Sequence, residues 1–177
     1  MKAGNQINLP VLRTTYFIGK IVSWLFSKRW GIRLLNQIVK PLKGKKIDSL
    51  ACEEVHIPSR NGGPDIRVRV FRPENMDAPL ASILFIHGGG YVSMVPEIAL
   101  NTIAGYIKLR PCIVVAPDYR KAISDPFPAG FNDCYDTLLW MRDNAELLKI
   151  KDDKFILAGE SAGGGLTAAV TLKARDT

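Results

Sequence analysis

The sequence is poor in histidine and cysteine, which removes several classes of site at the outset. Only two of the 177 residues are histidines, His56 and His87. The three cysteines, Cys52, Cys112 and Cys134, are far apart and form no Cys-x-x-Cys pair. This spacing excludes a disulfide framework and a cysteine–histidine metal centre, so we expect no metal and no cofactor. Unpaired thiols are typical of a reducing compartment, which predicts a cytoplasmic protein.

The sequence also lacks a long apolar run. Its first apolar stretch, residues 16–26, is interrupted by Lys20 and followed by Lys28 and Arg29 rather than by small residues. A secretory signal peptide needs an apolar segment that leads to a small-residue cleavage site. A membrane-spanning helix needs roughly 18 uncharged apolar residues. The sequence therefore predicts neither a signal peptide nor a transmembrane helix.

Acidic residues are absent from the first 47 positions, which hold ten lysines and arginines. The remaining 130 residues carry 14 basic and 17 acidic side chains. A basic arm on a mildly acidic body predicts peripheral contact of residues 14–46 with an anionic membrane, through charge attraction that salt screens. An ordinary solvated helix face is the alternative at this point. Nucleic acid is not an expected partner, because no nucleic-acid-binding motif is present.

The basic end has the spacing of amphipathic helices. Apolar residues recur at mostly three- to four-residue steps between positions 14 and 40, which predicts one or two helices interrupted near Gly31. A basic, glycine-containing linker follows at residues 41–49. We therefore divide the chain into a basic helical segment, 1–47, and a larger domain, 48–177.

The larger domain opens with the pattern of two paired strands. Segments 53–58 and 66–71 are separated by a glycine-containing turn at 61–65. Arg67 and Arg69 alternate with valine in the second segment. This alternation predicts an antiparallel pair with one half-exposed face.

The rest of the domain alternates between apolar strands and helices. The continuous apolar runs 82–86 and 113–116 predict parallel strands covered on both faces. Helical spacing at 98–109 and 131–148 places a helix after each run, and a further apolar run ends at residue 158. This order predicts an α/β fold, a mostly parallel sheet with helices on both faces.

The turn after the last apolar run carries the most informative motif, Gly159-Glu160-Ser161-Ala162-Gly163. A strand, a tight turn and a helix around Gly-x-Ser-x-Gly is the context of a nucleophile elbow. Such a turn holds the serine hydroxyl exposed and within reach of a base. Glycines on both sides leave out the Cβ atoms that would collide where the backbone reverses. Ser161 is therefore the candidate nucleophile, supported by Gly159 and Gly163.

A second glycine-rich motif strengthens this interpretation. The apolar run at 83–86 leads directly into His87, Gly88, Gly89 and Gly90, roughly 70 residues before the serine motif. Glycines allow a backbone to approach a substrate closely and to present N–H groups to a developing oxyanion. The two motifs together are far more specific than either alone.

With these motifs the chain resembles the hormone-sensitive-lipase-type family of α/β-hydrolase esterases, over about residues 55–172. Segments 117–120, 126–129 and 133–134 are similar to the family's Asp-Tyr-Arg and Phe-Pro-Ala…Asp-Cys stretches. The resemblance implies an α/β-hydrolase fold and a small-molecule ester substrate with a short- to medium-length acyl chain. It also implies an acyl-enzyme formed on Ser161.

The resemblance assigns an oxyanion hole to the motif residues. The backbone N–H groups of Gly89, Gly90 and Ala162 are implied to bind the oxyanion, and Gly88 to shape the loop. His87 is implied to position this loop rather than to act as the base.

Two features near the motifs keep open roles. Glu160 either orients the turn or forms an ion pair. The family continues Asp-Tyr-Arg with Leu-Ala-Pro-Glu-His, whereas residues 121–125 in this sequence are Lys-Ala-Ile-Ser-Asp, so the role of this loop is open.

The resemblance also implies that the N-terminal helices form part of a cap over the active-site mouth. In that case Phe17, Trp24 and Phe26 line the acyl pocket. Packing of these side chains on the core, or a helix lying on a membrane surface, are the alternatives.

The catalytic acid and base remain unassigned. In the family both follow the nucleophile, whereas only 16 residues follow Ser161 in this chain and none of them is histidine. We expect the chain to be the N-terminal portion of a longer enzyme, inactive by itself. The strand before Ser161 would then have an open apolar edge, which predicts aggregation. A non-catalytic ligand-binding protein and a serine peptidase of the same fold are the alternatives.

Overall fold

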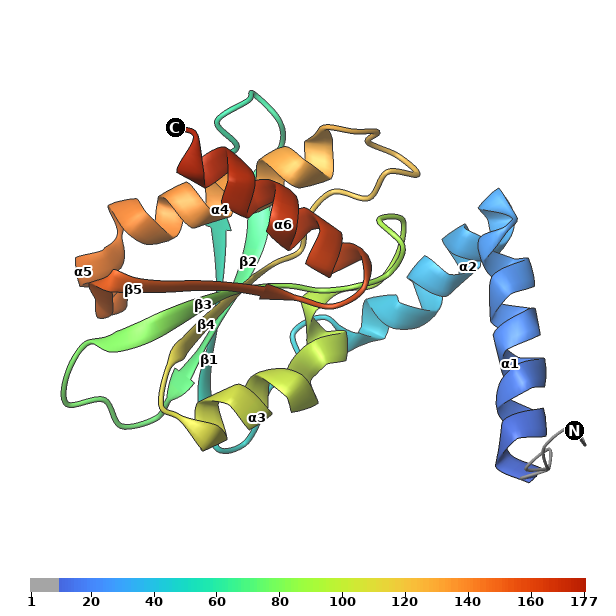
Figure 1. Ribbon diagram of the computed structural model, residues 1–177, viewed down its shortest axis with the longest axis horizontal. Coiled ribbons are helices and arrows are strands. Elements are labelled where there is room, and N and C mark those ends of the chain that lie inside the picture. The colour runs from blue at the N-terminus through green and yellow to red at the C-terminus, as the bar shows by residue number, and fades with distance from the viewer. Residues whose placement is uncertain (1–9) are drawn as a thin grey trace, which may run out of the picture.

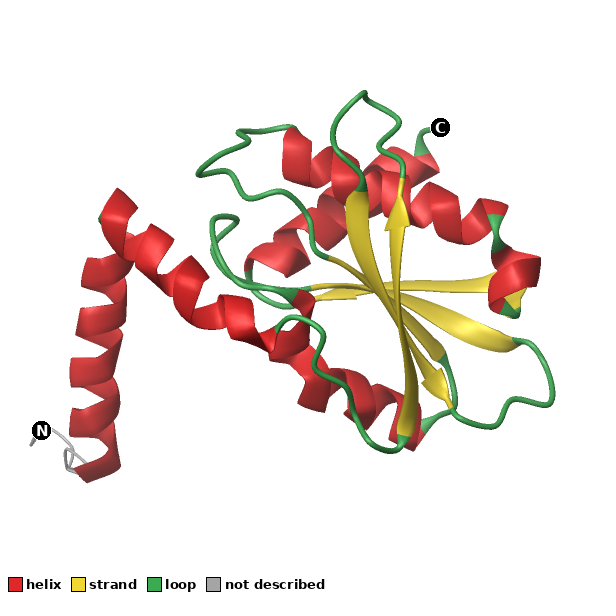
Figure 2. Ribbon diagram, turned by 180° about the vertical axis from the view of Figure 1, so that it is seen from behind, coloured by secondary structure: helices red, strands yellow, loops and turns green. Residues whose placement is uncertain are grey.

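The computed structural model describes residues 10–177, apart from the side chains at 10–14, 25, 26, 152 and 153. It contains a five-stranded sheet with helices on both faces (Figure 1 and Figure 2). The strands are β1 (Leu50–Ile57), β2 (Ile66–Pro73), β3 (Leu80–Ile86), β4 (Ile113–Pro117) and β5 (Ile150–Gly159). The helices are α1 (Pro10–Phe26), α2 (Arg29–Val39), α3 (Leu100–Leu109), α4 (Ala129–Asp143), α5 (Ala145–Leu148) and α6 (Ala162–Arg175), with short 3₁₀ turns η1 (Lys40–Leu42) and η2 (Pro96–Ala99).

The strand order across the sheet is β1-β2-β4-β3-β5. β1 and β2 form the predicted antiparallel pair, with Ile57 opposite Ile66 next to the turn, and β2 also runs antiparallel to β4. β3 runs parallel to β4 and β5, with Ile86 opposite Gly159. The predicted order of two opening strands and then βα units is confirmed. The topology places the ends of β3 and β5, and thus the two glycine-rich motifs, side by side.

β5 lies at one edge of the sheet, and no strand among the described residues pairs with its outer side. Ile156 in this strand is 52% exposed. The open apolar edge expected from the sequence is therefore found in the described part of the chain. An unpaired edge of this kind is a template for pairing with another strand.

Alternate residues of the central strands build two hydrophobic clusters, one on each face of the sheet. Leu84 and Ile86 belong to the cluster that α4 and α6 cover, whereas Ile83 and Phe85 belong to the cluster that α3 covers. Each fully buried side chain of this size stabilises the fold by roughly 1.5–3 kcal/mol. Because helices cover both faces, β3 is apolar at successive positions, as the sequence predicts.

The arginines of β2 are more buried than their alternation with valine predicts. The Arg67 and Arg69 side chains are 12% and 2% exposed, and both form ion pairs with the fully buried Glu97 carboxylate. Glu54 pairs with the same two arginines. The prediction of a half-exposed face is wrong for β2, because η2 places Glu97 over this strand and compensates charges that would otherwise be costly to bury, whereas Glu53 and Glu54 of β1 are exposed.

The segment after α2, predicted as a linker, is attached to the domain by polar contacts. Lys43 forms an ion pair of 2.7 Å with Asp118, and the Arg69 guanidinium donates a hydrogen bond of 3.0 Å to the Lys45 carbonyl. The N-terminal helices are therefore joined to the domain at the same ion cluster that covers β2.

The two N-terminal helices are separated at Ser27 rather than near Gly31. The Ser27 hydroxyl donates a hydrogen bond of 2.7 Å to the Trp24 carbonyl, and Lys28 is extended, with φ −118° and ψ 130°. Gly31 lies buried inside α2. The predicted interruption is wrong in its position, because a serine side chain competes for a helical carbonyl whereas the glycine is accommodated in the helix.

Helix α1 stands away from the sheet and packs chiefly on α2 (Figure 1). Its Phe17 and Trp24 side chains are 64% and 54% exposed and do not line the cavity near Ser161, so their place in an acyl pocket stays a prediction. The side chain of Phe26, the third predicted pocket residue, lies outside those described. Over residues 10–177, every helix is too short or too polar to span a bilayer.

The predicted helix 131–148 begins earlier, at Ala129, and is interrupted at Asn144. The Asn144 side-chain amide donates a hydrogen bond of 2.9 Å to the Trp140 carbonyl, and its backbone leaves the helical region. The last turn therefore forms the separate helix α5. The predicted helix 98–109 begins in the 3₁₀ turn η2 and continues as α3.

Candidate active site

Ser161 occupies a sharp turn between β5 and α6, with φ 52° and ψ −118°. A non-glycine residue with positive φ costs on the order of 1–3 kcal/mol, so the surrounding structure must hold it there. The Glu160 carbonyl accepts a hydrogen bond of 2.8 Å from the Gly163 N–H, and the Glu160 N–H donates one of 3.2 Å to the Ile86 carbonyl. The turn is thus fixed on both sides, and Ser161 is exposed.

The two glycines around Ser161 allow α6 to start directly against the sheet. A Cβ atom added at Gly163 would lie 2.0 Å from the Ile86 carbonyl oxygen and 2.6 Å from that of His87. A Cβ atom at Gly159 would lie 2.5 Å from the Gly163 carbonyl oxygen. Because all of these neighbours are backbone atoms, no side-chain rotation could relieve the overlap.

The loop after β3 passes beside Ser161. The position of a Cβ atom on Gly88 would be 3.0 Å from the Glu160 carbonyl oxygen and 3.4 Å from the Ser161 Cβ. Gly89 and Gly90 have φ of 122° and 62°, which glycine adopts without steric cost. The structure therefore brings together the two motifs that the sequence singles out.

Two backbone N–H groups of this loop have no acceptor among the described residues. In the described part of the chain, no hydrogen bond is donated by the N–H of Gly89 or of Gly90, whereas the Gly89 carbonyl accepts from Val92 and Ser93. Ala162 is the first residue of α6, where N–H groups have no partner within the helix. Donors of this kind near the serine can stabilise negative charge that develops on a substrate oxygen.

His87 is completely buried beneath this loop, stacked on Tyr119 with ring centroids 4.4 Å apart. Its Nδ1 lies 2.6 Å from the Gly88 carbonyl oxygen and its Nε2 lies 3.3 Å from the Lys121 ammonium. Because an ammonium only donates, Nε2 is the acceptor and Nδ1 carries the hydrogen that is donated to Gly88. Burial, and next the Lys121 charge, lower the pKa of His87 to about 3. The neutral ring has both nitrogens occupied, which suits a residue that positions the loop.

Lys121 stands where the chain departs from the family's sequence. Its side chain is 14% exposed, forms an ion pair of 3.0 Å with Asp118, and lies over the Tyr119 ring. Burial by itself raises the pKa of Asp118, but the ammonium groups of Lys121 and Lys43 outweigh this effect and lower the pKa to about 2. The departure from the family's sequence therefore places a cation between Asp118 and His87. These contacts favour a structural role for Lys121, in the loop whose role the sequence left open.

Other residues of the Asp-Tyr-Arg stretch also support the loops rather than face Ser161. The Tyr119 hydroxyl donates a hydrogen bond of 3.0 Å to the His87 carbonyl. The Arg120 guanidinium pairs with Asp133 of α4 at 2.7 Å. These contacts support a structural role for the stretch.

Glu160 accepts a hydrogen bond of 2.9 Å from the Thr102 hydroxyl of α3. No ion pair among the described residues involves it, so of its two predicted roles the contacts favour orientation of the turn. The hydrogen bond links the turn at Ser161 to the helix on the opposite face of the sheet from α6.

The second histidine lies at the far side of the sheet. His56 is in β1, which three strands separate from β5, and at about 4.8 Å between neighbouring strands this is roughly 19 Å. Within residues 10–177, neither histidine is therefore placed to take a proton from Ser161. The described residues also contain no group of histidine, cysteine and carboxylate side chains that could hold a metal ion.

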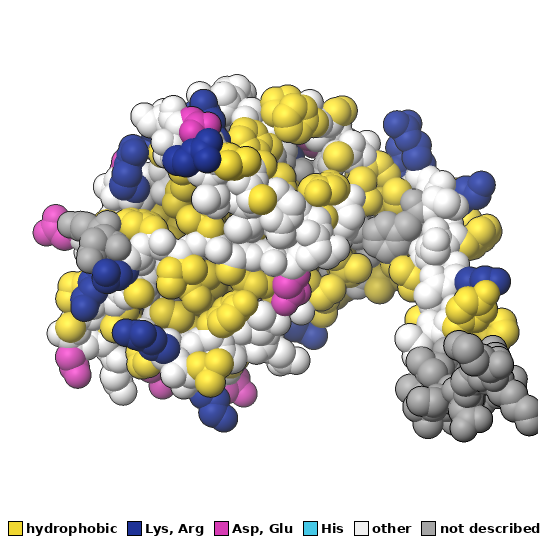
Figure 3. Space-filling view, in the orientation of Figure 1, with side chains coloured by type: hydrophobic (Ala, Val, Ile, Leu, Met, Phe, Trp, Pro, Cys, Tyr) yellow, Lys and Arg dark blue, Asp and Glu magenta, His cyan; other side chains and the backbone are white. Residues whose placement is uncertain are grey.

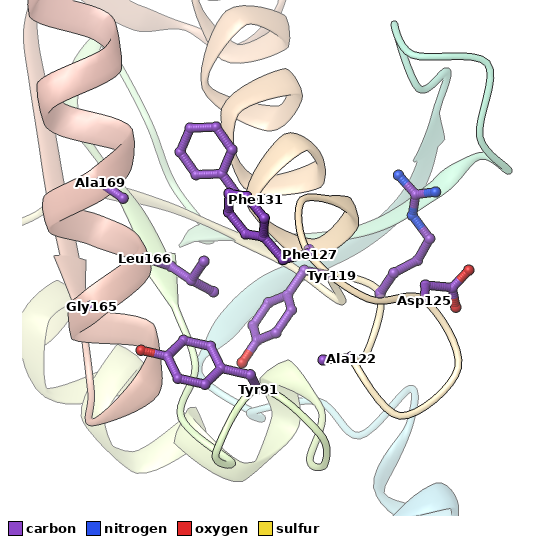
Figure 4. Close-up of a pocket in the computed structure, with 11 residues that line it drawn as sticks. Tyr91, Tyr119, Ala122, Asp125, Phe127, Phe131, Gly165, Leu166 and Ala169 are labelled. Atoms are coloured by element: carbon purple, nitrogen blue, oxygen red, sulfur yellow. The ribbon is translucent and has the colours of Figure 1, made fainter.

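A largely apolar cavity of about 390 Å³ lies beside the first turns of α6 (Figure 4). Gly165 lines this cavity, and its N–H donates a hydrogen bond of 3.2 Å to the Ser161 carbonyl, so the cavity lies one helical turn from Ser161. Tyr91 reaches across from the loop after β3, so that a Cβ atom on Gly165 would lie 2.6 Å from its hydroxyl oxygen. Sequence reasoning did not assign these lining residues, although Tyr91 directly follows the glycine motif. The lining residues are Tyr91, Tyr119, Arg120, Ala122, Asp125, Phe127, Gly130, Phe131, Gly165, Leu166 and Ala169.

Comparison with known proteins agrees with this architecture. Residues 83–177 match a family model described as alpha/beta hydrolase fold. An AB hydrolase superfamily protein of Schizosaccharomyces pombe is 30% identical over 171 residues, which cover 94% of this chain and 47% of that protein. Carboxylesterase NlhH of Mycobacterium tuberculosis is 34% identical over 153 residues, or 85% of this chain and 48% of that protein.

A solved structure named bacterial heroin esterase superimposes with a TM-score of 0.74 at 32% identity, over 86% of this chain and 47% of that one. The chain thus spans about half the length of the relatives it matches. The fold, the paired glycine motifs and these similarities together show that the chain belongs to the α/β-hydrolase family of esterases and lipases.

Proposed function

We propose that Ser161 is the nucleophile of a carboxylesterase that acts on short- to medium-chain acyl esters. The observation that carries the proposal is the juxtaposition at the ends of β3 and β5. The Gly88 backbone lies against the Ser161 Cβ, and the N–H groups of Gly89 and Gly90 have no internal acceptor among the described residues. A strained, exposed serine beside unpaired donors is the arrangement that acyl transfer requires.

The reaction proceeds through an acyl-enzyme. The Ser161 oxygen attacks the ester carbonyl carbon and gives up its proton, and the carbonyl oxygen becomes negative. The N–H groups of Gly89, Gly90 and Ala162 donate to that oxygen, and each such donor typically contributes about 10²–10³ in turnover. The bond to the alcohol oxygen then breaks, the alcohol leaves with a proton, and water releases the acid in a second addition.

The base that takes the Ser161 proton, and the acid that orients it, are proposed to come from residues outside this 177-residue stretch. The described histidines are occupied or distant, and the relatives that the chain matches are about twice as long. The 177 residues alone are accordingly proposed to be inactive. A serine-dependent burst of acyl release from this chain by itself would contradict that part of the proposal.

The cavity beside Tyr91 supports a small substrate group. Its volume of about 390 Å³ lies at the low end of the range for small-molecule pockets, about 300–1,000 Å³. Phe127 and Phe131, 6.3 Å apart between ring centroids, contribute aromatic surface to it. A short acyl chain or an aryl alcohol is the class of group that such a lining accommodates.

The test is hydrolysis of p-nitrophenyl esters of increasing acyl length by the full-length protein and by Ser161→Ala. We expect the substitution to lower turnover at least about 10³-fold, because the covalent route is removed. Ser49→Ala, which removes an exposed serine hydroxyl next to β1, at the opposite edge of the sheet from β5, is the matched control and should leave turnover unchanged. Retention of turnover in Ser161→Ala would remove Ser161 from the mechanism. Tight binding of a small ester by a wild-type protein without turnover would favour the non-catalytic binding alternative.

A further inference from the structure

The N-terminal helices expose an unusual amount of apolar surface. On α1, Phe17, Ile21 and Trp24 recur at helical spacing on one face, and on α2, Trp30, Leu34 and Ile38 do the same. These six side chains, which we call the apolar strip, are between 48% and 64% exposed. The Trp24 and Trp30 rings are in contact, with centroids 5.4 Å apart, so the two apolar faces are continuous.

The opposite side of α2 explains why the strip faces outward. Gly31, Ile32 and Val39 are buried against the rest of the protein, and the Asn36 amide donates a hydrogen bond of 3.1 Å to the Val92 carbonyl. This leaves the face with Trp30 unpartnered in the described part of the chain. Docking of α2 thereby orients the strip away from the domain.

Exposed basic side chains lie on both helices that carry the apolar strip, and Figure 3 shows several lysine and arginine side chains at this end of the molecule. No acidic residue occurs in the first 47 positions, and no ion pair among the described residues involves the basic side chains beside the strip. A helix with tryptophan and phenylalanine on one face and basic residues around it suits the boundary between lipid headgroups and acyl chains. The exposed basic residues concerned are Lys20, Lys28, Arg29, Arg33 and Lys40.

We propose that the apolar strip and its basic flank bind the surface of a bilayer that contains anionic phospholipid. The uncompensated charge selects this occupant, because an apolar face alone would equally suit another protein surface. Charge attraction brings the helices to the headgroups, and the strip then inserts into the boundary layer. The proposal does not depend on Ser161, so its failure and the failure of the esterase function are distinguishable.

The first test removes charge. The full-length protein is sedimented with vesicles of phosphatidylcholine alone, or with one third phosphatidylglycerol, at low and high salt. We expect binding only to the anionic vesicles and its weakening by salt. Each basic residue contributes about fivefold to the partition coefficient, so a triple variant should bind the anionic vesicles roughly 100-fold more weakly. The variant is Lys28→Gln/Arg29→Gln/Arg33→Gln, and the control removes three exposed charges elsewhere, Lys108→Gln/Arg110→Gln/Lys173→Gln.

The second test removes apolar surface while keeping both tryptophans of the strip as reporters. Phe17→Ser/Leu34→Ser should weaken vesicle binding by about tenfold for each residue. Leu109→Ser/Leu147→Ser is the control, because these leucines are 87% and 77% exposed on the domain. Because all four side chains are exposed, none of these changes should unfold the protein. Wild-type tryptophan fluorescence should shift to the blue on anionic vesicles.

Four results would overturn the proposal. Equal binding to neutral and anionic vesicles removes anionic phospholipid as the feature that is recognised, and no binding to either removes the lipid surface as the occupant. Tryptophan emission that is already blue-shifted without vesicles, and unchanged by them, means that the protein's own residues cover the strip. If the wild-type protein forms a dimer and does not bind vesicles, and Phe17→Ser/Leu34→Ser dissociates that dimer, the strip is the contact with a second copy.

Discussion

Alanine substitutions at two neighbouring glycines at the start of α6 are predicted to change the free energy of unfolding in opposite directions. At Gly163 an added Cβ would lie 2.0 Å from the Ile86 carbonyl oxygen, so the helix must move by more than 1 Å to reach ordinary contact. At Gly164 the nearest atom, the Gly159 carbonyl oxygen, is 3.5 Å away, which is already ordinary contact. The first site is therefore closed to a methyl group, and the second is open.

The magnitudes follow from these contacts. Overpacking against rigid backbone costs about 1–3 kcal/mol, so Gly163→Ala should lower the free energy of unfolding by that amount. Gly164→Ala replaces a helical glycine without strain and should raise it by about 0.4–1 kcal/mol. Because Ala162 moves with the helix, Gly163→Ala should also reduce ester turnover by up to about 10²-fold.

The assay is urea unfolding followed by tryptophan fluorescence, since Trp140 on α4 packs against the cluster that α6 completes. The two variants should shift the midpoint in opposite directions with little change in the dependence on urea. Equal stability of the two variants, or greater loss at Gly164, would refute the reasoning that backbone contact at Ile86 sets the position of α6.

Three further predictions concern buried groups of the domain. Because the pKa of His87 is held at about 3 in the folded protein against 6.5 otherwise, its contribution to stability is fully present above pH 6.5 and is lost as pH falls toward 3. The unfolding free energy should therefore fall between pH 6.5 and 4.5 by up to about 1.4 kcal/mol per pH unit, and His87→Gln should remove this slope. Absence of the slope in the wild-type protein would contradict the burial of a neutral ring. Glu97→Gln should destabilise the protein by up to about 3–5 kcal/mol, because it removes the buried carboxylate that Arg67 and Arg69 share and leaves the buried Arg69 paired only with the partly exposed Glu54. Glu53→Gln removes an exposed carboxylate paired with Arg72 and should change stability by less than about 1 kcal/mol. Similar losses in the two variants, measured by urea unfolding, would argue against the ion cluster. Burial raises the thiol pKa of both Cys112 and Cys134, so a thiol reagent should modify only Cys52 in the native protein and all three cysteines after unfolding, and rapid native labelling of Cys134 would show that the core opens.

Much of the fold could be predicted from local pattern. Continuous apolar runs identified β3 and β4, because strands covered on both faces need no polar positions. The glycines around Ser161 identified the turn, because only glycine tolerates the close backbone contacts found at Gly159 and Gly163. In both cases a short stretch of sequence contains the whole physical reason.

The features that the sequence did not reveal depend on partners that are distant along the chain. Arg67 and Arg69 have the pattern of an exposed face, but Glu97 folds over them from η2. Lys121 is recognisable only as a departure from the family, and its meaning depends on His87 lying 3.3 Å away. The end of α1 is an exception, because the Ser27 hydroxyl bonds to a carbonyl only three residues away, and apolar spacing does not encode that local contact.

The most direct test of the central claim is to trap the acyl-enzyme. The full-length protein is mixed with p-nitrophenyl butyrate, quenched in acid within the first turnovers and digested, and the mass of the peptide that contains residue 161 is measured. We predict a butyryl group on Ser161, absent from Ser161→Ala. Hydrolysis with no adduct in either protein, or an adduct on another residue, would contradict the assignment of Ser161 as the nucleophile.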